Sequence, residues 1–294
     1  LLIMSTEQAY KSFSSWISSL LNTCISVLKV MLRSKTGIRL PSATTDTCIV
    51  LGNGPSLKTS LQKHPDLFKN HPLVCVNSFS VTDEYILLKP GYYVMLDPGF
   101  WFGDNSELVN STLESIISKT TWPLELIVPQ LAAKSALITE ISKKNPNIHV
   151  TFFNYTVFKG FQNIAYSFYR KNLAAPQSQN VLVAAIFCSI NIGFKKILLF
   201  GADHTWHEQL HVNDENVLCL KNIHFYENES SISHKPFYKG VHSKETFRVD
   251  EIFVTWGKTF YGYVALNDYA ISENCEILNA SEISFIDAFK RVKL

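Results

Sequence analysis

Short apolar runs alternate with segments of helical periodicity from about residue 47 to residue 291, and this alternation constrains the fold more than any other feature. Strands that alternate with helices build a mainly parallel sheet covered by helices. The pattern predicts strands at 48–51, 73–76, 92–96, 124–128, 149–153, 196–200 and 276–278. It predicts helices at 57–64, 106–119, 131–144, 161–170, 181–192 and 282–291. We therefore expect an α/β fold with one Rossmann-type domain and helices on both faces of the sheet.

A further helical segment is expected at 244–271, although Gly257 and Gly262 argue against one unbroken helix. Composition supports a folded domain, because 46% of the 294 residues are apolar and only 18% are charged. The net charge is +2, which is too close to neutral for a general nucleic-acid-binding protein. The six cysteines form no CxxC pattern, so we expect a reducing cytoplasmic setting and no disulfide framework.

The N-terminal segment 16–32 reads WISSLLNTCISVLKVML and has apolar residues at helical spacing. It is short and striped with polar residues, so we expect a poor membrane-spanning helix. Two interpretations stay open: a helix packed on the domain or on a partner chain, and an interfacial helix at the inner face of the cell membrane. Basic residues near its end would favour anionic lipid: Lys29, Arg33, Lys35 and Arg39. We place the amphipathic helix and a linker in 1–46, and the ligand-binding domain in 47–294.

The first motif that can carry chemistry is CIVLGNGPSL at 48–57, a strand followed by a glycine-rich turn and a helix. Glycines let the backbone approach a ligand closely, and a helix N-terminus offers unpaired N–H groups to a phosphate. Gly52, Asn53, Gly54 and Ser56 are therefore candidate nucleotide-binding residues. The motif is neither a Walker loop nor a full GxGxxG, and a tight turn without a ligand is the alternative.

Two further motifs follow predicted core strands. Asn77 comes directly after 73–76 and could bind a base or ribose through its amide, or form an Asx turn. Gly201, Asp203 and His204 follow 196–200, where ligands bind in open α/β sheets. Asp203 could hold a sugar hydroxyl or orient a neighbouring group; helix capping or a loop salt bridge is the alternative.

Histidines crowd into one stretch of the chain, which holds His204, His207, His211, His224, His234 and His242. The polar stretch at about 204–243 is long for a plain connection and is expected to be a lid. His242 is expected in a loop before a helix, and histidine has the pKa range of a general base. A surface histidine without a catalytic role is the alternative. No Cys or carboxylate set completes a metal site with these histidines, so no metal is expected.

Taken in order, these motifs resemble bacterial sialyltransferases of glycosyltransferase family 42. The matching segments are 52–57, Asn77, 201–203 and 242–244, within a resemblance that covers about 47–290. The resemblance implies a GT-A-like variant of the Rossmann-type fold, a CMP-activated sugar donor, and metal-independent transfer with inversion. It implies that His242 deprotonates the acceptor hydroxyl, and that Asn53, Asn77 and Asp203 bind nucleotide or donor.

The same resemblance places Ser178 near the donor phosphate and Asp97 at the position of a family asparagine. The family's arginine before the buried helix has no counterpart in 175–179, and its aromatic hydroxyls are replaced by 204–207. Assistance to the leaving phosphate would then come from His204, His207 or Tyr238. Sialic acid, another nonulosonate and Kdo all remain open as the transferred sugar, and no cofactor is expected beyond the donor itself.

The function expected from these motifs is glycosyl transfer to a glycan or lipid-linked oligosaccharide in surface-polysaccharide or lipopolysaccharide synthesis. Two alternatives stay open. One is a Mg²⁺-dependent pterin-type diphosphokinase, with Asp97, Asp203 and Asp214 as ligands. The other is a non-catalytic nucleotide-sugar-binding subunit of a polysaccharide complex. A homo-oligomer is also compatible with the sequence.

Overall fold

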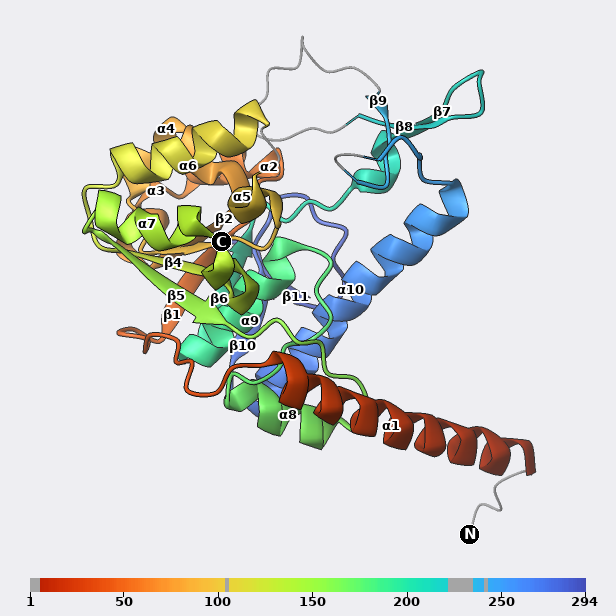
Figure 1. Ribbon diagram of the computed structural model, residues 1–294. Coiled ribbons are helices and arrows are strands. Elements are labelled where there is room, and N and C mark those ends of the chain that lie inside the picture. Colours follow the sequence, from red (N-terminus) through yellow and green to blue (C-terminus); the bar gives the residue numbers. More distant parts are fainter. Residues whose placement is uncertain (1–5, 104–105, 222–234, 241–242) are drawn as a thin grey trace.

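The computed structural model describes residues 6–103, 106–221, 235–240 and 243–294, and its core is one eight-stranded sheet. The strand order is β11-β10-β6-β1-β2-β3-β4-β5, and every neighbouring pair is parallel. The strands are β1 Thr47–Leu51, β2 Leu73–Val76, β3 Tyr92–Val94, β4 Leu124–Pro129, β5 Ile148–Phe153, β6 Lys196–Phe200, β10 Glu276–Asn279 and β11 Lys290–Arg291. The predicted α/β class with a mainly parallel sheet is confirmed (Figure 1).

Helices cover both faces of this sheet, and alternate residues of its central strands enter one of two cores. Val50 packs in the core under α8 Gln162–Arg170, α9 Val181–Ile192 and α10 Val249–Ser272, while its neighbour Leu51 packs in the opposite core. That second core lies under α2 Ser56–Lys63, α3 Pro65–Asn70, η1 Asn77–Val81, α4 Asp83–Leu88, α5 Gly99–Phe102, α6 Glu107–Lys119, η2 Gln130–Lys134 and α7 Ala136–Lys144. Burial on both faces explains why the strands read as continuous apolar runs.

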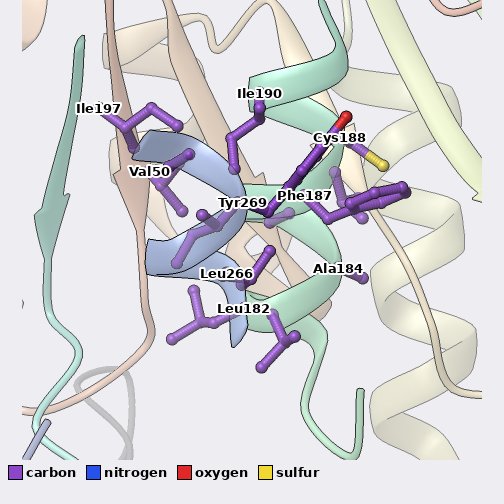
Figure 2. Packing of buried hydrophobic residues seen from close by; sticks show 14 of the residues in the cluster. Val50, Leu182, Ala184, Phe187, Cys188, Ile190, Ile197, Leu266 and Tyr269 are labelled. Atoms are coloured by element: carbon purple, nitrogen blue, oxygen red, sulfur yellow. The ribbon is translucent and has the colours of Figure 1, made fainter. Parts of the chain in front are cut away.

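The central helix α9 is apolar all round because it lies between the sheet and α10. Figure 2 shows Phe187 of α9 among Leu266 and Tyr269 of α10, with Val50 and Ile197 of the sheet nearby. α10 is continuous through Gly257 and Gly262, so the prediction of an interrupted helix is wrong. A side chain at Gly262 would approach the carbonyl oxygen of Gln177 to 2.8 Å, so this glycine permits close packing beside α9.

The connection between β5 and β6 produces a topological switch point beside β1. From β1 the chain adds β2, β3, β4 and β5 on one side, then returns through α8 and α9 to place β6 on the other side. The loops that follow β1 and β6 therefore begin at adjacent strand ends. In open α/β sheets, ligands bind in the crevice at such a point.

One side of the N-terminal helix α1 Thr6–Arg33 contacts the domain through Thr23, Ser26 and Val30, while most of its large apolar residues are exposed. Thr23 Oγ1 accepts a hydrogen bond from the Phe161 amide, and Ser26 Oγ donates one to the Lys159 carbonyl, both at 2.9 Å. The opposite side exposes large apolar residues: Tyr10, Phe13, Trp16, Ile17, Leu20, Leu21, Ile25, Leu28, Met31 and Leu32. Figure 1 shows α1 extending away from the body toward the N-terminus.

The stretch Tyr10–Arg33 is long and apolar enough to cross a membrane by length and composition alone, whereas the polar residues of 16–32 predicted a poor membrane-spanning helix. Its second half is tied to the domain through Thr23, Ser26 and the buried Val30. The part of α1 before Ser19 is shorter than the roughly 20 residues that a spanning helix needs. The packed arrangement therefore keeps α1 beside the domain.

The segment 204–243 holds a second, three-stranded antiparallel sheet, as far as its residues are described. Its strands are β7 Leu210–Val212, β8 Leu218–Leu220 and β9 Lys235–Pro236, preceded by η3 Trp206–Gln209. This sheet lies near the beginning of α10, apart from the main sheet (Figure 1). The predicted boundary between 1–46 and 47–294, and the role of this insert as a lid, stay predictions.

The C-terminal segment 282–291 was expected to be helical, and this prediction is wrong. Its polar groups bond to the loop after β6 instead: Ser284 Oγ donates to the Ala202 carbonyl at 2.6 Å, and the Phe285 amide donates to the Asp203 carbonyl at 2.8 Å. The segment ends in β11, which pairs with β10. The expected helix 131–144 is also divided, at Ser135, into η2 and α7.

Candidate functional site

A cavity of about 1650 Å³ opens along the carboxyl ends of the parallel strands. Residues that follow five neighbouring strands line it: Asn53 and Gly54 after β1, Asn77 after β2, Asp97 after β3, Gln130 after β4, and Asn154 and Tyr155 after β5. Gly201, Asp203 and His204 line it from beyond β6. The cavity exceeds the roughly 300–1,000 Å³ typical of small-molecule sites, so it has room for two substrates.

The glycine-rich turn after β1 packs directly on the loop after β6. The Gly52 amide donates to the Phe200 carbonyl at 2.7 Å, and the Gly54 amide donates to the Gly201 carbonyl at 2.8 Å. A methyl group at Gly52 would overlap the Gly201 carbonyl, and one at Gly54 would lie 2.5 Å from Asp203 Oδ1. Glycine at these two positions therefore allows the two loops to pack against each other, whether or not a ligand is bound.

Asp203 is buried and joins the loop after β6 to the beginning of α2. Its Oδ2 accepts the Ser56 amide at 2.9 Å, and its Oδ1 accepts the Ser56 hydroxyl at 2.5 Å. Burial raises the pKa of this carboxyl above its ordinary value, while the hydrogen bonds from Ser56 oppose that shift. Asp203 thus caps α2 from a distant part of the chain, which is one of the two interpretations that its sequence position allowed.

Several buried polar atoms of cavity-lining residues have no hydrogen-bond partner among the described residues. They are Asn53 Oδ1, Trp101 Nε1 and Gln209 Oε1. The amide nitrogen of Asn53 is held by the Val76 carbonyl at 3.1 Å, which fixes the orientation of the side chain. Buried polar atoms normally have a partner, so these atoms are groups that a ligand could satisfy.

The other sequence-predicted binding residues line the same cavity, and each also has a local structural role. Asn77 has a φ of 49° at the beginning of η1, and its carbonyl accepts the Tyr93 hydroxyl. Asp97 Oδ1 accepts the Gly99 amide at 2.9 Å, which begins the turn into α5. Ser178 is buried, donates to the Pro176 carbonyl at 3.3 Å and accepts the Tyr155 hydroxyl through its own carbonyl.

His204 is buried in an aromatic cluster beside the cavity. Its Nε2 lies 2.7 Å from the Tyr263 hydroxyl, and its ring centroid lies 4.2 Å from that of Trp206. Burial lowers the pKa of His204 to about 3, so the imidazole is neutral at physiological pH. A neutral ring can assist a leaving phosphate through a hydrogen bond but supplies no positive charge. The ring of His207 lies against that of Phe285, with 4.3 Å between the centroids, and His207 does not line the cavity.

The remaining predicted residues come from the insert. Tyr238 is exposed, forms a bridge with Thr246, and does not line the cavity. His242, the expected general base, lies outside the described residues. The Ser243 amide after it donates to the Gly240 carbonyl at 3.0 Å. The roles assigned to these two residues stay predictions.

Sequence reasoning missed several residues of the cavity wall. Trp206 and Gln209 come from η3, and Lys134 comes from η2. Arg33 is the last residue of α1, and Lys35 follows the helix. Only tertiary structure brings the N-terminal segment to the ends of β4 and β5. Across the part of the chain that the structure describes, no group of three or more His, Cys, Asp and Glu side chains is arranged to hold a metal ion.

Comparisons with known proteins give a distant structural likeness. No protein-family model matches the chain, and no curated protein sequence matches it either. The chain is similar to the structure of the MAf glycosyltransferase from Magnetospirillum magneticum AMB-1, with 11% identity and a TM-score of 0.48. The likeness covers 92% of this chain and 38% of that protein, so the chain spans well under half of its length.

Proposed function

We propose that this chain is a glycosyltransferase that moves a sugar from a CMP-activated donor to a glycan hydroxyl. The observation that carries the proposal is the cavity at the β1 and β6 switch point, where the buried Oδ1 of Asn53 has no partner among the described residues. Nucleotides bind at such points in doubly wound sheets. The order of the motifs along the sequence, with GNGPSL first and His242 last, supports transfer of sialic acid, a related nonulosonate or Kdo.

The proposed reaction is a direct displacement with inversion and without a metal ion. The acceptor hydroxyl gives its proton to His242, and its oxygen forms a bond to the anomeric carbon of the donor. The bond from that carbon to the phosphate oxygen breaks, and CMP leaves with the electron pair. Asn53 and Asn77 would hold the nucleotide, and Asp203 would act as a positioning residue through its bonds to Ser56.

The biological setting proposed is the synthesis of surface polysaccharide or lipopolysaccharide at the inner face of the cell membrane. The exposed apolar side of α1 is a surface of the kind that marks an interaction site. Exposed cations lie near its end, at Lys29 and Arg33, and would attract anionic lipid headgroups. We commit to a lipid surface as the occupant; a second copy of the chain is the outcome that would contradict this assignment.

A ligand panel tests the proposed function. Thermal shift and hydrolysis are measured with CMP-, UDP- and GDP-sugars and with ATP, each with and without a chelator. The proposal predicts stabilisation and turnover with CMP-sugars that a chelator leaves unchanged. ATP turnover that requires Mg²⁺ would favour a diphosphokinase, and nucleotide-sugar binding without turnover would favour a non-catalytic subunit.

The role of His242 is tested by replacing it. General bases contribute about 10²–10⁴-fold in rate, so His242→Ala should lower transfer at least about a hundredfold and still bind nucleotide. His149→Ala is the matched control, because His149 is exposed on β5 and pairs with Glu125 outside the cavity. Equal transfer rates for both variants would overturn the assignment of the base.

A further inference from the structure

Three basic side chains line one end of the cavity: Arg33, Lys35 and Lys134. Lys134 belongs to η2, which follows β4. The Lys35 amide donates a hydrogen bond to Asn154, the residue that follows β5. In the strand order, β4 and β5 lie at one edge of the sheet, several strands away from the switch point between β1 and β6. The cations therefore lie at the far end of the cavity from Asn53 and Asp203.

The backbone that carries Arg33 and Lys35 is held in place by a buried side chain. Asn154 Oδ1 accepts the Lys35 amide at 2.9 Å, and its Nδ2 donates to the Lys35 carbonyl at 2.8 Å. The same nitrogen donates to the Asn172 carbonyl at 2.7 Å, and Asn154 is only 1% exposed. Ser34 Oγ adds a bond of 2.8 Å to Thr156 Oγ1. This part of the expected linker is thus a fixed wall of the cavity.

All three side chains are exposed, so water solvates their charges, but exposure does not explain why they gather on the wall of one cavity. Arg33 is the last residue of α1, where a cation stabilises the negative end of the helix dipole. Lys35 lies beyond the helix, and Lys134 belongs to a different element, so the dipole explains neither. Among the described residues, none of the three forms an ion pair.

The carboxylates of the cavity lining are already engaged elsewhere. Asp203 accepts two hydrogen bonds from Ser56, and Asp97 accepts one from Gly99. The basic end of the cavity therefore offers charge-assisted donors that its own lining does not neutralise. Guanidinium and ammonium groups bind carboxylate and phosphate oxygens with shorter and stronger hydrogen bonds than neutral donors do.

We infer that Arg33, Lys35 and Lys134 form an anion-binding subsite that takes a carboxylate or phosphate group of a substrate. The subsite itself stands on the geometry of the cavity, and only the assignment of that group to a sugar donor or glycan acceptor rests on the proposed function. The nucleotide would occupy the switch point, and the anionic part of a substrate would extend toward β5. Arg33 and Lys35, at the end of α1 and just after it, thereby form part of the substrate site.

Calorimetric titration of the full chain with inorganic pyrophosphate, in the absence of lipid, tests the subsite. Arg33→Gln/Lys35→Gln and Lys134→Gln should each weaken pyrophosphate binding at least about tenfold. The control Lys29→Gln/Arg39→Gln removes two exposed cations of the same segment that do not line the cavity, and should bind within about twofold of the wild type. The inference would be overturned if the wild type did not bind pyrophosphate, or if the control variant lost as much affinity as the subsite variants.

A second arm separates a substrate anion from a lipid headgroup as the source of the negative charge. The same variants are sedimented with vesicles of phosphatidylcholine alone or mixed with phosphatidylglycerol. The inference predicts that the two Gln variants of the subsite lose pyrophosphate binding without losing more vesicle binding than the control does. Loss of vesicle binding alone would overturn it. If the wild type binds pyrophosphate through these residues but turns over no CMP-sugar, the subsite is supported and the proposed function is rejected.

Discussion

The carboxylate of Asp203 accepts both the amide and the hydroxyl of Ser56, at 2.9 and 2.5 Å, across a separation of 147 residues along the chain. Ser56 is the first residue of α2, and Asp203 follows β6, so this pair joins the two loops of the switch point. The arrangement resembles a helix cap supplied by a distant residue. It holds the glycine-rich turn and Asn53 in position at the cavity.

Replacing Asp203 should therefore destabilise the fold. Asp203→Ala leaves the amide and the hydroxyl of Ser56 buried without their acceptor, which costs about 1–3 kcal/mol for each such group. Asp97→Ala is the matched control, because Asp97 is exposed and accepts a single hydrogen bond, so its loss should cost less than about 1 kcal/mol. Urea unfolding measures the free energy of unfolding of both variants. Equal losses of unfolding free energy would contradict the capping role of Asp203.

Two glycines should respond in opposite directions to the same substitution. Gly54→Ala places a methyl group 2.5 Å from Asp203 Oδ1 and 2.6 Å from the Gly201 carbonyl, and overpacking of this kind costs about 1–3 kcal/mol. Gly257 lies within α10, and a methyl group added to it would meet no atom within 4 Å, so Gly257→Ala should stabilise by about 0.5–1 kcal/mol. Thermal unfolding of both variants checks the signs.

The burial of His204 should make stability fall in mild acid. Its pKa is about 3 in the folded chain and about 6.5 when exposed, so only the unfolded chain takes up the proton as pH falls below 6.5. The stabilising contribution is complete above pH 6.5 and is lost as pH falls toward 3.

His204→Asn should remove this sensitivity, and asparagine also tolerates the positive φ of 53° at this position. Between pH 7 and pH 5.5 the wild type should lose about 1 kcal/mol more unfolding free energy than the variant does. Urea unfolding at the two pH values provides the comparison. Parallel losses in both proteins would show that His204 is protonated as readily in the folded chain as in water.

The contact between α1 and the domain, and the exposed apolar residues of α1, give a further pair of variants. Thr23→Ala removes the acceptor of the Phe161 amide and should lower the unfolding free energy by about 1–3 kcal/mol. Leu28→Ser lies on the exposed side, so it should change stability by less than about 0.5 kcal/mol and weaken binding to anionic vesicles. Vesicle sedimentation and urea unfolding separate the two effects; unchanged vesicle binding by Leu28→Ser would argue against the lipid surface.

The sequence predicted the sheet well because its strands are buried on both faces. β2, β6 and α9 match their predicted ranges at both ends. Continuous apolar runs are stable only where they are buried on both sides, so their position in the fold can be predicted from the sequence. The short helices α3, α4 and α5 carry no such pattern and were missed.

The failures came from interactions between distant parts of the chain. Helical periodicity at 282–291 is overridden because Ser284 and Phe285 bond to the loop after β6. The cavity-lining role of Arg33 and Lys35 was missed for the same reason: Asn154, more than a hundred residues away, fixes their backbone. Residues that follow strands, such as Asn53 and Asp97, line one cavity because parallel strands all end at the same edge of the sheet, and their binding roles stay predictions.

The central claim is that the cavity at the β1 and β6 switch point binds the nucleotide of an activated sugar through Asn53. Calorimetric titration of CMP into the wild type, Asn53→Ala and Asn191→Ala tests it most directly. Asn191 is the control, because its side chain bonds to Tyr169 and Tyr269 outside the cavity lining. The account predicts that Asn53→Ala binds CMP at least about tenfold more weakly, whereas Asn191→Ala binds as the wild type does; a wild type that does not bind CMP, or an Asn53→Ala variant with unchanged affinity, would contradict it.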